Sequence, residues 1–333
     1  MKNIKIFILA IVMLGVVFAG DESRLGTTAG AQVSVPVGAR DLAMAGADLV
    51  YSRGVDAVFW NPASIGGIQG ANGTFSNMSY IADVKVNYFA IGATMGNLGN
   101  IGVTAKTLDL GDIPITTVQA MDGTGANFSP TVMTMGVTYG KAFTDRINFG
   151  ITGKLIYESI PRASASAFAF DIGVQYINFA NIEGLGLALV LKNIGSSMHY
   201  TGSGLKAEAT SEEFSEFFDR EASYDQLPSS YSIGSSYKIG NSILFGASFI
   251  SNNTSYDEFN FGGEYNFNNM IFLRGGLNSA MVQDVDKDNV LFGPSFGFGI
   301  HYELLGIGLL LDYAYRPANY FDGNQLISLG FAF

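Results

Sequence analysis

His301 is the residue of this sequence best suited to acid–base chemistry, because the chain has two histidines and no cysteine. Ser295 falls on the same face of an alternating segment, and Asp312 lies in the next such segment. A serine nucleophile, a histidine base and an orienting aspartate are the groups that a hydrolase needs. The polar interior of a β-barrel would hold the same side chains as hydrogen-bonding residues. We expect the second arrangement and no catalytic residues, and keep an outer-membrane hydrolase as a third functional hypothesis.

An acidic run offers a candidate metal site, because Asp284, Asp286 and Asp288 present alternate carboxylates. Such spacing is typical of loops that wrap a calcium ion. However, the sixth position of the pattern holds no glycine, and the twelfth holds Ser295 instead of glutamate. We interpret the run as a solvated acidic loop, with calcium binding as the alternative, and expect no cofactor.

Seven charged residues fall on the predicted inward faces of strands. Charges in such positions are costly unless they are paired or hydrated. We expect them to form a network in the lumen that holds a plug, and a selectivity filter for solutes is the alternative. The residues are Lys154, Glu158, Asp171, Glu264, Arg274, Asp312 and Arg316.

An aromatic cluster lies in the long segment 195–229, within the stretch TSEEFSEFFDREA. Thr210 and Glu213 have the spacing of a helix capping box, and three phenylalanines would share one face of the predicted helix. One interpretation is a lid whose phenylalanines pack on the barrel rim. The other is a docking face for a partner protein, since exposed aromatic patches often mark interfaces. The phenylalanines are Phe214, Phe217 and Phe218.

The elements that must position these residues are β-strands. The chain contains 42 glycines, 26 phenylalanines and 16 tyrosines, but only 14% charged residues, and its mean hydropathy is positive. After the first twenty residues, no stretch is apolar for the roughly 18 residues that a helical span needs. A hydrophobic, aromatic chain without helical spans is typical of a transmembrane β-barrel.

Period-two alternation supports the barrel. Ile327, Leu329 and Phe331 would share one face of the last strand, and small or polar residues would share the other. A soluble β-sandwich would have no reason to face large apolar residues outward on nearly every strand. We therefore predict an all-β, transmembrane antiparallel barrel of about 14 strands. The expected strands are 72–80, 85–95, 100–108, 131–140, 147–158, 168–176, 185–194, 231–239, 242–250, 258–267, 270–277, 295–302, 305–316 and 327–333.

The lengths of the connections give independent support. The links after even-numbered strands are short, and those after odd-numbered strands are mostly long, including 109–130, 159–166 and 195–229. Outer-membrane barrels show this asymmetry, with tight turns on the periplasmic side and long loops outside. An even number of strands then places both ends of the barrel in the periplasm.

The first residues have the pattern of a secretory signal peptide, with two lysines followed by an apolar stretch from Ile6 to Ala19. An uncleaved anchor is the alternative, although the stretch is short for a span. We expect a signal peptide at 1–19, an N-terminal plug at 20–70 and the barrel at 71–333. The net charge of -11 argues against a nucleic-acid partner, and the barrel should contact outer-membrane lipid.

The predicted plug contains the only tryptophan of the chain, Trp60. A barrel of about 14 strands has a lumen too wide for its own side chains to fill, so a peptide segment usually occupies it. Small residues in 26–70 would pack closely against the wall, while Pro62 would set a turn. Trp60 would supply one bulky anchor.

Residues of this segment also resemble a known family. Gly38-Ala39-Arg40 with Met44 and Gly46, followed by Trp60-Asn61-Pro62-Ala63, is similar to the N-terminal signature of the PorV/PorQ family of outer-membrane proteins, which is related to the fatty-acid transporter FadL. The resemblance implies a FadL-like barrel of fourteen strands with an N-terminal plug. It also implies a role in type IX secretion, in which PorV associates with a translocon barrel and carries the C-terminal domains of cargo.

Two main functional hypotheses follow. The first is a non-enzymatic shuttle for protein export or surface attachment, whose partners are a secretion translocon barrel and cargo C-terminal domains. The second is a FadL-like transporter that binds a hydrophobic ligand between residues 26–70 and the wall.

Overall fold

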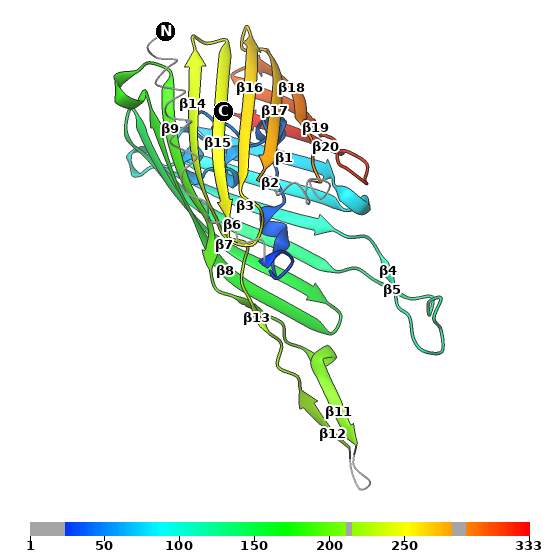
Figure 1. Ribbon diagram of the computed structural model, residues 1–333. Coiled ribbons are helices and arrows are strands. Elements are labelled where there is room, and N and C mark those ends of the chain that lie inside the picture. The colour runs from blue at the N-terminus through cyan, green and yellow to red at the C-terminus, as the bar shows by residue number, and fades with distance from the viewer. Residues whose placement is uncertain (1–23, 211–214, 282–290) are drawn as a thin grey trace.

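The computed structural model describes residues 24–210, 215–281 and 291–333, so the predicted signal peptide and the acidic run Asp284, Asp286 and Asp288 lie outside the described residues. Fourteen antiparallel strands close into one barrel, as predicted (Figure 1). The barrel strands are β1 (Ala71–Ser79), β2 (Lys85–Thr94), β3 (Asn100–Asp109), β6 (Thr131–Thr144), β7 (Ile147–Ile160), β8 (Ala163–Ile177), β9 (Leu185–Gly195), β14 (Ser230–Ile239), β15 (Ile243–Asn252), β16 (Glu258–Phe267), β17 (Ile271–Ala280), β18 (Ser295–Leu304), β19 (Ile307–Arg316) and β20 (Asn324–Ala332).

The two faces of the wall differ in the way that a membrane barrel requires. β1 pairs with β20 and closes the ring, with Ser76 opposite Ser328 on the inside. On β8, Phe168 is 64% exposed on the outer face, whereas its neighbour Ala169 is 1% exposed on the inner face. Large apolar side chains project outward in this way on strands all around the ring. Only hydrocarbon solvates such a surface favourably, so the strands cross a membrane.

The connections follow the predicted alternation in part, since the links 80–84 and 253–257 are short and one further link needs correction. The link 159–166, expected to be a long loop, is a tight turn, because β7 and β8 continue until Ile160 pairs with Ala163. Pro161 and Arg162 alone make the turn, and proline suits the second position of such turns. We call the end of the barrel with the short links the short-turn end, and the opposite end the long-loop end.

The longer connections form small hairpins. They are β4 (Ile113–Pro114) with β5 (Asn127–Phe128), β10 (Met198–His199) with β13 (Tyr224–Asp225), and β11 (Lys206–Thr210) with β12 (Ser215–Asp219). The helix predicted around 210–219 is therefore wrong. A short isolated helix gains little stability in water, whereas here each strand of the hairpin pairs five residues with the other.

The β11–β12 hairpin projects away from the barrel (Figure 1). Phe217 and Phe218 are consecutive residues of an extended strand, and Phe214 lies outside the described residues. Phe217 and Phe218 therefore do not share a helical face.

Residues 24–70, which we call the N-terminal segment, run through the interior of the ring. Arg24 Nη2 donates to Gln226 Oε1 at the long-loop end (2.6 Å), and the Gly70 carbonyl accepts from the Thr94 amide at the short-turn end (2.9 Å). In between lie four short helices, η3 (Ala31–Ser34), α2 (Ala39–Ala43), η4 (Asp56–Phe59) and η5 (Pro62–Gly67). α2 packs against β17–β20, and η5 packs against β3 and β6–β8, so the segment reaches opposite walls.

Other short helices lie in the connections, namely η6 (Ile81–Asp83), η7 (Gly96–Leu98), η8 (Phe179–Asn181) and η9 (Ser203–Leu205). None of the helices in the described part of the chain is long and apolar enough to cross a membrane.

The wall is lined with glycine where the N-terminal segment touches it. A side chain at Gly150 would place its Cβ atom 2.2 Å from the Pro62 carbonyl oxygen, and one at Gly276 would lie 2.3 Å from the Met44 carbonyl carbon. The absence of a side chain lets the two backbones approach closely. The inward-facing glycines that contact residues 43–66 are Gly92, Gly102, Gly140, Gly150, Gly173, Gly186, Gly234, Gly246, Gly262, Gly276 and Gly297.

Candidate functional site

Trp60 holds the N-terminal segment together from within. Its indole Nε1 donates to the Val37 carbonyl oxygen (2.8 Å). The ring lies against Gly46, where a Cβ atom would be only 2.3 Å from Cζ3. Gly46 also has a φ of 71°, a left-handed conformation that favours glycine. Trp60 thus packs two turns of the segment against each other and also packs on clusters that include residues of the wall.

Asn61 fixes the start of η5. Its side chain accepts a hydrogen bond from the Ala63 amide (2.9 Å) and donates one to the Leu49 carbonyl (2.8 Å). Pro62 occupies the first helical position, where its missing N–H costs nothing. Gln175 on β8 also donates to the Leu49 carbonyl (3.1 Å), so the wall and the segment share this turn.

On one side of the lumen, ion pairs join the N-terminal segment to the wall. Arg40 contacts Asp41 (2.7 Å), Asp48 (3.0 Å) and, on β16, Glu264 (3.2 Å). Burial alone would lower the pKa of Arg40, but the three carboxylates hold the pKa well above its ordinary value. Burial raises the pKa of Asp41 to about 6, against the opposing effects of Arg40 and the Ser52 hydroxyl.

The same group of charges continues along the wall. Arg274 on β17 contacts Glu264 (2.7 Å) and Asp312 (2.5 Å), and His301 Nε2 lies 3.3 Å from Asp312. Ser295 does not join them, because it lies six residues from His301 in the same strand, roughly 20 Å away. The three residues cannot act together as a hydrolytic triad.

The opposite side of the lumen carries lysines. Lys154 on β7 pairs with Asp171 on β8 (2.7 Å). Lys106 Nζ on β3 donates to the Val35 carbonyl (2.9 Å) and lies 4.6 Å from the centroid of the Phe59 ring. Lys192 Nζ on β9 lies 3.8 Å from the same centroid. Lys106 and Lys192 are absent from the seven predicted lumen residues, although the period-two pattern of their strands places both on the inner face.

The two remaining predicted lumen residues lie apart from these groups. Glu158 accepts a hydrogen bond from the Tyr200 hydroxyl. The Arg316 guanidinium lies over the Phe292 ring, 3.6 Å from its centroid. The seven predicted residues therefore belong to several separate groups, of which the one around Arg274 touches the N-terminal segment through Arg40.

An apolar cluster fills the lumen at the long-loop end. Met198 and Leu227 from the loops pack on Val33 of the N-terminal segment and on Ile156 of β7. Three inward-facing alanines of β8 complete the cluster, which we call the entrance cluster. The alanines are Ala165, Ala167 and Ala169.

Two cavities lie between the N-terminal segment and different parts of the wall. One, of about 30 Å³, is lined by Val33, Val58, Phe59 and Tyr88 and by polar or charged side chains of the wall. The polar or charged residues are Thr104, Lys106, Thr134, Thr152, Lys154 and Asp171. The other, of about 420 Å³, lies at the short-turn end, where Val55 and Asp56 face β1, β19 and β20, and its lining includes Asp312.

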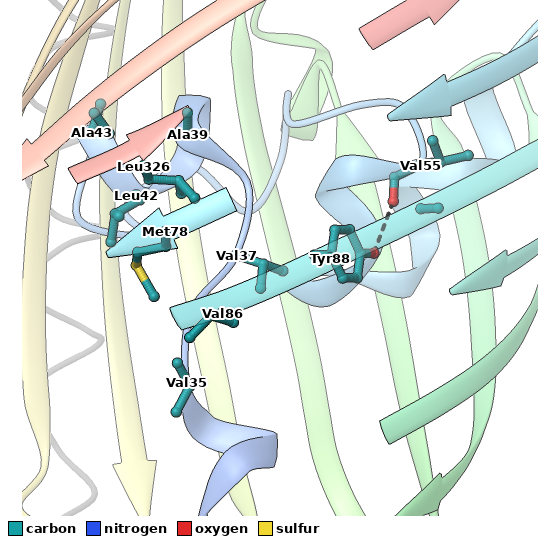
Figure 2. Close-up of a cluster of buried hydrophobic side chains, with 12 residues drawn as sticks. Val35, Val37, Ala39, Leu42, Ala43, Val55, Met78, Val86, Tyr88 and Leu326 are labelled. Carbon is teal, nitrogen blue, oxygen red and sulfur yellow. Dashed lines mark hydrogen bonds between the residues drawn. The ribbon is translucent and has the colours of Figure 1, made fainter. Parts of the chain in front are cut away.

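A hydrogen bond separates the two cavities. Figure 2 shows the Tyr88 hydroxyl donating to the Val55 carbonyl (3.2 Å), beside a cluster that includes Val37 and Val86. Tyr88 lines the smaller cavity and Val55 lines the larger one, so this contact lies between them.

The described residues contain no group of three or more His, Asp or Glu side chains that could hold a metal ion. The candidate calcium ligands Asp284, Asp286 and Asp288 are not among these residues.

Comparisons with solved structures identify the fold. No protein-family model matches the sequence, and no curated protein matches it. The CymD monoaromatic hydrocarbon channel is similar, with 10% identity and a TM-score of 0.55 over 90% of this chain and 98% of that chain. The P. putida toluene transporter TodX has 12% identity and a TM-score of 0.56, over 90% of this chain and 99% of that chain. A Pseudomonas aeruginosa FadL homologue has 10% identity and a TM-score of 0.52, over 90% of this chain and 98% of that chain.

These structures confirm that the barrel is FadL-like, as the resemblance implied. They give no support to membership of the PorV/PorQ family.

Proposed function

We propose that the protein is an outer-membrane channel for a small hydrophobic solute, with the N-terminal segment as its plug. The observation that carries the proposal is a line of spaces that begins at the apolar entrance cluster and continues through two cavities between the N-terminal segment and the wall. The interior of a barrel that conducts hydrated solutes is polar. Inward-facing Ile156 and the alanines of β8 depart from that rule at the long-loop end.

The line of spaces continues through the barrel. Val33 belongs to the entrance cluster and also lines the small cavity beside Phe59. From there, the contact between Tyr88 and Val55 leads to the large cavity at the short-turn end. The route is closed at Phe59 and again at Tyr88, so a solute passes only when part of the N-terminal segment moves. The ion pairs around Arg40 and Arg274 hold the rest of the segment in place.

The structural likenesses agree with this function, since CymD and TodX are described as a hydrocarbon channel and a toluene transporter. The export shuttle has less support, because the predicted helix that would present Phe217 and Phe218 on one face is a strand. A hydrolase has none, because Ser295 lies far from His301.

Uptake by whole cells tests the proposal. A Gram-negative host without its own hydrocarbon channels would express the protein, and the initial uptake of radiolabelled toluene and hexane would be measured. We expect faster uptake of at least one of these solutes than in cells with an empty vector. Ala167→Phe should abolish the gain by filling the entrance cluster. Ala105→Phe, the same change on the outer face of β3, is the control and should leave the rate unchanged.

Equal uptake in expressing and empty cells, with the barrel folded in the outer membrane, would contradict the channel. Co-purification with a secretion barrel would instead favour the export shuttle.

A further inference from the structure

The Phe59 side chain lies in surroundings that suit an aromatic ring in particular. The ammonium groups of Lys106 and Lys192 both lie over the ring, at 4.6 and 3.8 Å from its centroid. Trp60 meets the ring edge-on, with the centroids 5.3 Å apart. The ring also forms part of the wall of the 30 Å³ cavity, beside Val58 and Tyr88.

The cavity beside the Phe59 ring holds more ammonium groups than carboxylates, and Asp171 is the carboxylate that lines it. Within the described ranges, neither Lys106 nor Lys192 forms an ion pair, and Asp171 pairs with Lys154. Lys106 is 4% exposed, and its hydrogen bonds go to the carbonyls of Val33 and Val35. Three lysines share Asp171, and burying ammonium groups in excess of their counter-charge is costly. Ionisable groups retained inside membrane proteins usually serve function. If the only role of this site were to bury the Phe59 side chain, apolar residues in place of the lysines would make the protein more stable.

The face of an aromatic ring attracts cations because its π electrons carry partial negative charge. A saturated hydrocarbon of the same size offers no such face. Two ammonium groups around one ring-shaped space therefore distinguish aromatic from saturated solutes.

We propose that the space filled by the Phe59 ring is a binding site for the aromatic ring of a transported solute, with Lys106 and Lys192 as its specificity determinants. Phe59 is then an internal occupant, which the solute replaces when this part of the N-terminal segment moves. The inference rests on the proposed channel function and adds the substrate class, a neutral monoaromatic molecule. The entrance cluster leads to this site, since Val33 belongs to both.

Binding to the purified full-length protein in detergent tests the site. Trp60 is the only tryptophan and touches Phe59, so its fluorescence reports on what occupies the space. Toluene and methylcyclohexane, which have similar sizes, are the two probes. Phe59→Ala vacates the space, so this variant should bind toluene roughly tenfold more tightly than the wild type does. The same variant should bind methylcyclohexane more weakly than it binds toluene. Phe59→Leu, which keeps most of the bulk, serves as a second variant should Phe59→Ala fold poorly.

A lysine substitution measures the contribution of the ammonium group to binding. Adding Lys192→Met to Phe59→Ala should weaken toluene binding by about tenfold and leave methylcyclohexane binding unchanged. Lys85→Met, which removes an exposed lysine at the start of β2, is the matched control and should change neither. Equal affinity of folded Phe59→Ala for the two probes, or no binding of either, would overturn the proposal. Cells that take up toluene and hexane equally well would leave the channel function standing and reject the aromatic site.

Discussion

The two sides of the lumen hold the N-terminal segment by different means. Next to β16–β19, Arg40 and Arg274 are enclosed by four carboxylates, and every pair is within 3.2 Å. Next to β3–β9, three lysines face Asp171, and two of them lie over the Phe59 ring. The first side has a matched set of ion pairs, whereas the second side has more ammonium groups than carboxylates, with the Phe59 ring among them. The comparison indicates that one side anchors the segment and the other can open.

Removing Arg274 should produce the largest effect. Arg274→Met leaves Glu264 and Asp312 buried in the wall without their main partner, and should lower the free energy of unfolding by about 3 to 5 kcal/mol. Urea titration of the protein refolded into lipid vesicles measures the change. Arg53→Met removes an exposed arginine of the same segment and should cost less than about 0.5 kcal/mol. An Arg274→Met variant as stable as the wild type would show that this side is no anchor.

A side chain at a wall glycine should push the segment away. Gly150→Val places carbon atoms where the Pro62 carbonyl lies, and should cost about 1 to 3 kcal/mol. It should also raise the ion conductance of single channels in planar bilayers, because η5 no longer seals against β7. Gly153→Val, on the outer face of the same strand, meets only the Phe170 ring at ordinary contact distance and is the control. Identical conductance in the two variants would contradict the close packing of η5.

Losing the cap of η5 should have a smaller effect. Asn61→Ala removes the bonds to the Ala63 amide and the Leu49 carbonyl, and should cost about 1 to 2 kcal/mol. The same urea titration measures it. Asn77→Ala, which removes a bond to Asn87 on the exposed face of β1, should change stability by only a few tenths of a kcal/mol. Equal losses in the two variants would mean that the turn at Asn61 is not specifically stabilised.

The smallest change in stability is expected where the route is closed. Tyr88→Phe keeps the ring and removes the hydrogen bond to the Val55 carbonyl, at a cost of about 1 kcal/mol. Because this bond separates the two cavities, toluene uptake by cells should rise while that of a hydrophilic sugar stays constant. A rise for both solutes would indicate a general leak, and no rise for either would place the barrier elsewhere.

The barrel could be predicted from the sequence because each strand carries its own signal. Side chains alternate between lipid and lumen, so Phe168 and Ala169 reveal the pattern without knowledge of the fold. Where two local patterns competed, prediction failed. The spacing of Thr210 and Glu213 indicates a helix, but strand pairing between residues distant from any core decides the structure of this hairpin.

The site was less accessible to prediction. The period-two pattern of their strands places Lys106 and Lys192 on the lumen face. Nothing in the neighbouring sequence of either residue, however, indicates that both contact the Phe59 ring. Their convergence depends on the closure of the ring and on the path of the N-terminal segment. The wall glycines were equally hard to predict. The need for glycine at Gly150 and Gly276 is evident only from the positions of Pro62 and Met44, which pack against them.

The rate of cysteine labelling tests most directly whether one side of the lumen opens while the other stays fixed. The chain has no cysteine, so Val58→Cys, beside Phe59, and Met44→Cys, against the anchored wall, each introduce a single thiol. Both positions are buried, at 4% and 0% exposure. A water-soluble thiol reagent would be applied with and without toluene. We predict that toluene speeds the labelling of Val58→Cys several-fold and leaves Met44→Cys unreactive; equal acceleration at both positions, or at neither, would contradict the account.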